Sequence, residues 1–175
     1  MAKILIVYST TDGHTLRICQ HLQQFIEQQE HLVTLVSIGD APETALDGVD
    51  KIVVGGSIRY GNYQPQVYEW ARRNHVALVN KPSAFFSVNL SARKPDKNRA
   101  ETNPYIKKFL KKSAWQPYEL AVFAGRIDYP NCSFLDRHII RCIMWMTNGP
   151  TNPTTVTEFT DWESVNAFAQ RICLM

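Results

Sequence analysis

The sequence predicts a doubly wound α/β fold, in which helices cover both faces of a five-stranded parallel sheet with strand order 2-1-3-4-5. Continuous apolar runs such as Ile4–Val7 and Ile52–Val54 alternate with amphipathic helical patterns, which is typical of buried parallel strands joined by crossover helices. A hydroxyl-rich turn follows the first run directly. The chain has 175 residues, and 45% of them are hydrophobic, which suits one domain, residues 1–175, with a full core.

Strands are expected where apolar runs are bounded by polar or turn residues. Most of these runs are continuously apolar, as strands buried on both faces require, whereas the second alternates between two faces. The turn Asp47–Asp50 leads into the third run, which ends in Gly55-Gly56-Ser57. The expected strands are Lys3–Tyr8, Leu32–Ile38, Lys51–Gly56, Ser83–Val88 and Leu120–Ala124.

Four segments between and after these strands carry apolar residues at helical spacing. In the first, Ile18, Leu22 and Ile26 share one face, which indicates a helix packed on the sheet. In the last, Thr160 or Asp161 is a suitable N-cap. The expected helices are His14–Gln29, Gln64–Val79, Asn98–Lys112 and Asp161–Leu174.

The stretch after the fifth strand does not belong to a minimal five-unit sheet. A polar turn leads into a helical pattern, Phe134–Met146, which is followed by residues 147–155, rich in Asn, Gly, Pro and Thr, and by a short extended run, Val156–Phe159. We expect an inserted helical segment, about residues 126–155, that interrupts strand 5.

The inserted helix has three interpretations. On a helical projection, Arg137, His138 and Arg141 share one narrow face, and apolar residues spread over the opposite face. A basic amphipathic helix over residues 133–147 can lie on an anionic membrane surface. It can also roof a pocket for a large apolar ligand, or pack on the domain's own core, and the sequence leaves these three alternatives open.

The first strand is followed by Ser9-Thr10-Thr11-Asp12-Gly13-His14-Thr15 and then by a helix. Free N–H groups and the helix dipole favour an anion at a helix N-terminus. Hydroxyls add donors, and Gly13 allows close approach of the backbone. The loop holds no Lys or Arg, so it predicts a phosphate monoester held by neutral donors rather than a nucleotide-hydrolysing P-loop. An ordinary capped turn is the alternative.

Two further turns, Gly56–Tyr63 and Ser87–Arg93, follow the third and fourth strands. The carboxyl ends of parallel strands share one edge of the sheet, where ligands bind in doubly wound folds. Small and polar residues with aromatics suit a flat ring, whose polar edge meets backbone amides while Tyr60 or Leu90 covers a face. Together the three loops predict a mononucleotide with a flat ring.

Charge and composition exclude several function classes. The net charge is +3, and the segment from Arg93 to Lys112 holds eight Lys or Arg residues against two acids. This basic patch suits an anionic partner such as a carboxylated substrate, and a solvated helix face is the alternative. The four cysteines form no C-x-x-C pair or metal spacing. No nucleic acid partner, catalytic triad or metal site is expected and no catalytic residue is assigned, which favours a cofactor that carries the reaction.

The N-terminus enters a strand directly, and no apolar run approaches the roughly 20 residues that span a membrane. We therefore expect a cytoplasmic protein without a transmembrane segment.

Several segments of the chain carry a family resemblance: Tyr8–Thr10 with Asp12-Gly13 and Thr15, Gly56–Gly61, Ser83–Leu90, Ala92–Pro95, Tyr129-Pro130, and Phe159 before Thr160-Asp161-Trp162. Together they resemble the flavodoxin-like proteins, and within them the bacterial menaquinone-dependent protoporphyrinogen IX dehydrogenases. The resemblance runs over essentially the whole chain, and the pair Ser87–Leu90 and Ala92–Pro95 is the most specific part of it.

The resemblance implies that FMN is bound, with its phosphate on the first loop and its ring between the other two. The implied cofactor-binding residues are Ser9, Thr10, Thr11, Asp12, Gly13, His14 and Thr15, then Ser57, Ile58, Arg59, Tyr60 and Gly61, then Ser87, Val88, Asn89 and Leu90. Simpler flavodoxins carry a hydroxyl where this chain has Asp12. A carboxylate repels phosphate, so we expect Asp12 to point away, toward an amide or Arg59.

The resemblance also implies a function: six-electron oxidation of protoporphyrinogen IX to protoporphyrin IX in haem biosynthesis, with menaquinone or another quinone as acceptor, at the cytoplasmic side of the inner membrane. Arg93, Lys94 and Lys97 are candidates to pair with substrate propionates, and Arg126 and Tyr129 are further substrate-binding candidates. The alternatives are a flavodoxin-type electron-transfer protein and an NAD(P)H–quinone reductase. Flavodoxin carriers are typically acidic, so the basic charge of this chain counts against the carrier.

Overall fold

A parallel sheet is the centre of the computed structural model, which describes residues 1–175 except the side chains of Glu43 and Thr44. The strand order is β2-β1-β3-β5-β6, and every neighbouring pair on this path is parallel. This is the predicted order 2-1-3-4-5. The strands are β1 (Lys3–Ser9), β2 (Leu32–Ser37), β3 (Lys51–Arg59), β5 (Ser83–Asn89) and β6 (Glu119–Ala124), with a short β4 (Asn62–Tyr63) antiparallel to β3.

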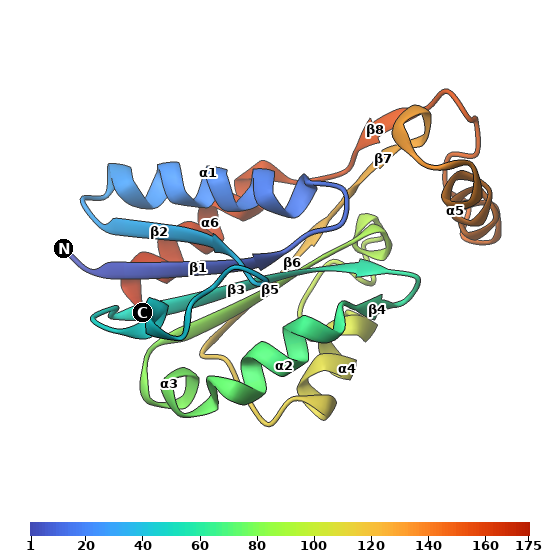
Figure 1. Cartoon of the computed structure of the whole chain (residues 1–175). Coiled ribbons are helices and arrows are strands. Elements are labelled where there is room, and N and C mark those ends of the chain that lie inside the picture. Colours follow the sequence, from blue (N-terminus) through green and yellow to red (C-terminus); the bar gives the residue numbers. More distant parts are fainter.

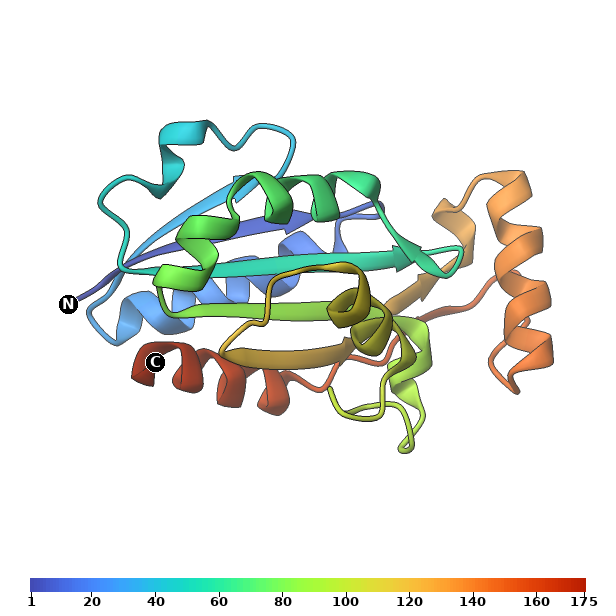
Figure 2. The same ribbon diagram turned by 90° about the horizontal axis from the view of Figure 1, so that it is seen from below.

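Helices cover both faces of the sheet, as Figure 1 and the view from below in Figure 2 show. On one face lie α1 (His14–Gln28) and α6 (Trp162–Leu174), and on the other α2 (Pro65–Arg73), α3 (His75–Asn80) and α4 (Pro104–Lys112). Short 3-10 turns are η1 (Glu43–Leu46), η2 (Leu90–Arg93) and η3 (Tyr129–Asn131). Each face has its own apolar core, one around Phe85 stacked on Phe109 and the other around Phe86 and Phe168.

Two of the predicted helices differ from the structure. The expected helix Gln64–Val79 divides at Asn74, whose backbone and side-chain N–H groups both bind the Trp70 carbonyl and end α2. The helix expected from Asn98 begins only at Pro104, because the Asn103 side chain accepts from the backbone of Tyr105 and Ile106 and Pro104 occupies the first turn.

β3 extends beyond its apolar run to Arg59, which carries the chain past the sheet edge. Gly55 is required within it, because a Cβ there would collide with the ring of Phe86. The two residues that join β3 to β4, Tyr60 and Gly61, both have positive φ (49° and 76°), as in a tight two-residue hairpin. The hairpin holds residues 57–61 beside the loop after β1.

The chain projects beyond the sheet after β6 and returns before α6 (Figure 1). We call residues 126–158 the α5 segment. In it, β7 (Arg126–Asp128) pairs antiparallel with β8 (Val156–Glu158), and α5 (Phe134–Met146) lies between them in the chain. β6 itself is unbroken, and β8 joins the separate β7–β8 ribbon. The segment has a small buried core of its own, Ile127, Tyr129 and Met144.

Candidate functional site

A cavity of about 570 Å³ lies at the carboxyl edge of the sheet. Its walls come from the loops after β1, β3, β5 and β6 and from α5, so the three loops singled out in the sequence border one space. Most of the predicted cofactor-binding residues line it: Thr10, Thr11, Asp12, Gly13, His14, Thr15, Ser57, Ile58, Arg59, Tyr60, Gly61, Val88, Asn89 and Leu90.

The loop after β1 is shaped for an anion. Gly13 has φ 84° and is the N-cap of α1, and its N–H donates to Thr10 Oγ1 at 3.0 Å. Thr15, in the first turn of α1, is buried, and its Oγ1 has no protein partner. A buried hydroxyl without a partner is costly, so Thr15 together with the N-terminal N–H groups of α1 offers unused donors to a ligand.

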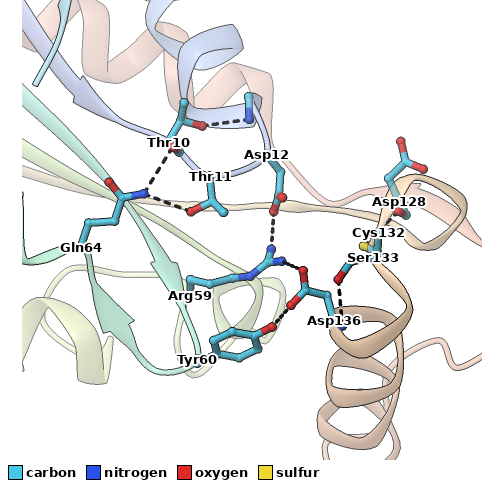
Figure 3. A network of polar contacts seen from close by, with 11 residues as sticks. Thr10, Thr11, Asp12, Arg59, Tyr60, Gln64, Asp128, Cys132, Ser133 and Asp136 are labelled. Carbon is cyan, nitrogen blue, oxygen red and sulfur yellow. Dashed lines mark hydrogen bonds and ion pairs between the residues drawn. The ribbon is translucent and has the colours of Figure 1, made fainter. Parts of the chain in front are cut away.

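Asp12 points away from this loop toward Arg59, as expected. Its Oδ2 lies 2.6 Å from Arg59 Nη1, and Arg59 Nη2 lies 2.8 Å from Oδ2 of Asp136 on α5. The Tyr60 hydroxyl donates to Asp136 as well. Figure 3 shows Arg59 between the two carboxylates, so one guanidinium joins the loop after β1, the β3–β4 hairpin and the α5 segment.

Two predicted cofactor residues do not line the cavity. The Ser9 hydroxyl donates to Gln64 Oε1 at 2.7 Å, and Gln64 in turn donates to Thr10 and Thr11. Ser87 is fully buried, where it accepts from Tyr63 and Asn89. Both serines therefore stabilise the loops after β1 and β5 through hydrogen bonds outside the cavity.

The imidazole of His14 is already engaged by the protein. Its Nε2 lies 2.6 Å from Thr160 Oγ1, and that hydroxyl donates its only proton to the Ala124 carbonyl at 2.7 Å. His14 must therefore be the donor, with its proton on Nε2. Burial lowers the pKa of His14, which keeps the ring neutral. Its side chain ties the loop after β1 to the point where the α5 segment returns.

The loops after β3 and β5 border the cavity from two sides. Ser57 has a buried Oγ without a protein partner, a second unused donor. The Asn89 side chain caps η2 by accepting from the Ala92 N–H, which fixes the position of Leu90. Tyr60 is half exposed at the hairpin tip, with its ring within 5.3 Å of the Arg59 guanidinium.

The basic residues that line the cavity are mostly occupied. Arg17 pairs with Glu158, Arg59 with Asp12 and Asp136, and Arg126 with Asp128. Arg93 donates to the carbonyls of Leu90 and Thr147 and to the Thr147 hydroxyl. Among the side chains that the structure describes, Lys97 Nζ is the cavity-lining cation without such a partner.

The remaining substrate-binding candidates lie elsewhere. Lys94 does not line the cavity. Tyr129 is buried in the core of the α5 segment, and its hydroxyl donates to the Pro150 carbonyl at 2.7 Å. Burial also raises the pKa of Tyr129; its burial and its bond to Pro150 make it a structural side chain.

The α5 helix is oriented differently from the basic amphipathic prediction. Arg137 Nε donates to the Tyr129 carbonyl at 2.9 Å, and Arg141 Nε to the Thr151 carbonyl at 2.7 Å. The Tyr129 carbonyl also accepts from the Cys132 N–H, so Arg137 adds a second donor to it, and Arg141 supplies a donor to the Thr151 carbonyl. Two residues of the basic face, Arg137 and Arg141, are therefore engaged with the segment itself, whereas the third, His138, is exposed.

The side of α5 toward the cavity is apolar, and the outer side exposes large hydrophobic residues together with His138. Ile140, Ile143 and Met144 line the cavity. On the outer side the large hydrophobic residues are exposed, with Phe134 at 76% and Trp145 at 74%, together with Leu135 and Met146.

Sequence reasoning missed Asp136 and Gln64 as site residues. Asp136 lies three residues after Ser133, as in a helix cap, and its N–H donates to the Ser133 hydroxyl. Its carboxylate, however, reaches Arg59 and Tyr60, more than 70 positions away in the chain. No local sequence pattern indicates a contact between residues so far apart in the chain.

In the described part of the chain, no group of three or more His, Cys, Asp or Glu side chains could hold a metal ion. None of the helices described there is long and apolar enough to cross a membrane.

Comparison with known proteins adds the following. The family described as "Flavodoxin domain" matches residues 5–154. The chain is 43% identical to protoporphyrinogen IX dehydrogenase (quinone) of Leishmania major over 95% of its own length and 73% of that protein. It is 39% identical to the protein of the same name from Escherichia coli K12, over 97% of this chain and 94% of that protein.

Two solved structures have a similar fold at low sequence identity. A short-chain flavodoxin associated with a non-canonical PDU bacterial microcompartment aligns with TM-score 0.57 and 13% identity, covering 98% of this chain and 97% of that one. A flavodoxin, WrbA-like protein from Agrobacterium tumefaciens aligns with TM-score 0.55 and 15% identity, covering 99% and 96%. Both have the fold of the present chain.

Proposed function

The chain belongs to the flavodoxin-domain family and, within it, to the protoporphyrinogen IX dehydrogenases (quinone), and we propose that it oxidises protoporphyrinogen IX with FMN and passes the electrons to a quinone. One observation carries the assignment of the site: three loops of the sheet edge converge on one cavity with two buried hydroxyls, Thr15 and Ser57, that have no protein partner. A phosphorylated ligand with a flat polar-edged ring fits this donor set.

FMN would be held by the three loops. The backbone of residues 13–15 and the hydroxyls of Thr11 and Thr15 suit its phosphate. The loops at 57–61 and 88–90 suit the two sides of its ring, with Tyr60 placed to cover a face. When bound, FMN supplies the hydride chemistry. The chain's own residues bind it, orient the substrate and shield the site.

Lys97 is our choice for the residue that binds a substrate propionate. Among the described side chains of the cavity wall it is the cation without a partner, and a charge-assisted hydrogen bond to a carboxylate would satisfy it. Arg126 is a weaker candidate because Asp128 Oδ2 already lies 2.9 Å from its guanidinium. Arg93, which holds Leu90 and Thr147, is a structural residue in this interpretation.

The function is tested by adding protoporphyrinogen IX and a menaquinone analogue anaerobically to the FMN-loaded protein. We expect porphyrin fluorescence well above that of a free-FMN control. No increase over that control would contradict the proposal and favour an electron-transfer protein, and rapid flavin reduction by NADPH would favour an NAD(P)H–quinone reductase.

A matched pair of lysine variants tests the substrate contact. Lys97→Gln should raise KM for protoporphyrinogen about tenfold, since it removes a charge-assisted contact. Lys111→Gln, on the exposed side of α4 and outside the cavity, should leave it unchanged. Equal effects of the two variants would contradict the assignment of Lys97.

We further propose that the outer face of α5 rests on the cytoplasmic surface of the inner membrane. Phe134, Leu135, Trp145 and Met146 form an exposed apolar strip, and Trp is suited to the membrane–water interface. Since Arg137 and Arg141 are engaged with carbonyls, attraction to anionic lipid would have to come from other cations, such as the exposed lysines of α4.

Vesicle co-sedimentation tests the membrane proposal. We expect binding to anionic vesicles that is largely lost in Phe134→Ser/Trp145→Ser and kept in Arg137→Gln. Binding that survives the double substitution would contradict the role of this strip.

A further inference from the structure

The α5 helix is tied at both ends to the loops that would flank a flavin ring. At its N-terminal end, Asp136 binds Arg59 and Tyr60 of the β3–β4 hairpin (Figure 3). At its C-terminal end, the carbonyl and hydroxyl of Thr147 each accept from Arg93 Nη2 at 2.9 Å. The helix therefore spans the distance from the loop after β3 to the loop after β5.

The side of α5 between these two ties faces the cavity. Ile140, Ile143 and Met144 form an apolar roof, and Leu90, which packs against the core around Met144, and Lys97 line the same cavity. Arg141, in the same stretch, is turned to the Thr151 carbonyl and does not line the cavity, whereas Lys97 supplies an unpaired cation among the described side chains of the cavity wall. A flat apolar ligand fits such a slot whether or not it carries carboxylates.

A second cavity lies too far from the flavin loops for a ligand bound in it to reach them. It is lined by residues around Pro82 and Ser83, at the start of β5, together with Tyr118 and Met175, so it lies at the amino edge of the sheet. A redox partner bound there is separated from the flavin loops by the length of the strands. The slot under α5, by contrast, borders both flavin loops directly.

We propose that the tetrapyrrole and the quinone occupy the slot under α5 in turn, so that each must leave before the other binds. The inference rests on the proposed function. In each round the tetrapyrrole gives up one hydride and one proton, and two electrons and two protons then convert the quinone to its quinol. The two ligands share the apolar roof, but only the tetrapyrrole uses Lys97.

Competition between the two ligands tests shared occupancy without turnover. Protoporphyrin IX is titrated into the oxidised, FMN-loaded full chain at several concentrations of menadione, with porphyrin fluorescence as the readout. We expect its apparent Kd to increase linearly with the menadione concentration while the fluorescence amplitude at saturation stays constant. An apparent Kd that does not change with menadione would overturn the proposal, because the ligands would then bind at separate places.

Three substitutions locate the shared slot. Ile143→Ala should weaken both ligands about fivefold, because each loses apolar contact with the roof. Lys97→Gln should weaken protoporphyrin IX about tenfold and leave menadione unchanged. Leu135→Ala, on the exposed side of the same helix, should alter neither, and FMN affinity serves as the test that each variant is folded.

Ile140→Ala is the second roof variant, used if Ile143→Ala loses FMN or fails to fold. A roof variant that weakens one ligand alone, or neither, overturns the shared slot. Failure of the proposed function has a different signature, since protoporphyrinogen would then yield no porphyrin while the competition between protoporphyrin IX and menadione is still present. Steady-state rates give a second check, because alternate occupancy predicts parallel double-reciprocal plots.

Discussion

The two walls of the cavity are built in opposite ways. The sheet edge is held by parallel strands with continuous buried cores on both faces. The α5 segment has three buried core residues and depends on guanidinium and carboxylate contacts to backbone and distant side chains. A rigid wall that presents donors is thus combined with a wall of lower local stability, which is suited to admit large ligands.

The largest loss of stability is expected from a substitution in the sheet wall. Gly55→Ala places a methyl group against the ring of Phe86 in the middle of the buried sheet, so the free energy of unfolding should fall by about 3 kcal/mol. Gly39→Ala is the matched control, since a Cβ there meets nothing within 4 Å. Urea denaturation measures both. Equal stability of the two variants would contradict the prediction, because it would show that the sheet accommodates a Cβ at residue 55 without loss of packing.

The α5 wall should respond locally to a comparable change. Met144→Ala removes a buried side chain from the three-residue core and should lower the opening free energy of the segment by about 2 kcal/mol. Native-state hydrogen exchange is expected to quicken across residues 126–158 and to stay unchanged in α1. Met146→Ala, exposed on the same helix, is the control. Faster exchange throughout the sheet would instead make the two walls one cooperative unit.

This difference also explains what the sequence could predict. Periodicity along the chain reports burial, so it identified the strands, their order and the three loops. It also placed α5 at Phe134–Met146. It could not orient that helix, because Arg137 and Arg141 look solvent-exposed in a pattern and are in fact satisfied by carbonyls of the loops around α5.

The same limit applies to individual site residues. Ser9 and Ser87 have the residue types of a ligand shell, but three-dimensional neighbours engage them away from the cavity. The contacts of Asp136 to Arg59 and Tyr60 join distant segments. A single sequence carries no signal for such pairs, since neither periodicity nor spacing links them.

The Arg59–Asp136 pair is where the two walls meet, and its expected effect is intermediate. A double-mutant cycle with Arg59→Gln and Asp136→Asn should give a coupling of about 1 kcal/mol in the opening free energy of the α5 segment, because both side chains are largely buried. The exposed helical pair Arg73–Glu69, tested by Arg73→Gln and Glu69→Gln, should give about 0.3 kcal/mol in global stability. A coupling at Arg59 no larger than this would mean that the contact does not hold the walls together.

The smallest expected effect is at the junction where the α5 segment returns to the sheet, between His14 and Thr160. Burial is the main reason that the pKa of His14 lies below its ordinary value of 6.5, with Arg17 and Arg126 lowering it further and Glu158 opposing them. As the pH falls, the unfolded chain therefore takes up this proton before the folded one does. The contribution of neutral His14 to stability is complete above pH 6.5 and is lost as the pH falls below 6.5 toward the folded-state pKa.

Urea denaturation between about pH 8 and about pH 5 should accordingly show a steeper loss of stability below pH 6.5 in the wild type than in His14→Gln. Thr160→Ser keeps the acceptor hydroxyl and should retain the wild-type slope. Parallel pH profiles for wild type and His14→Gln would contradict the inference that His14 is held neutral. The junction would then owe its position to its other contacts, such as the hydrogen bond from the Thr160 hydroxyl to the Ala124 carbonyl.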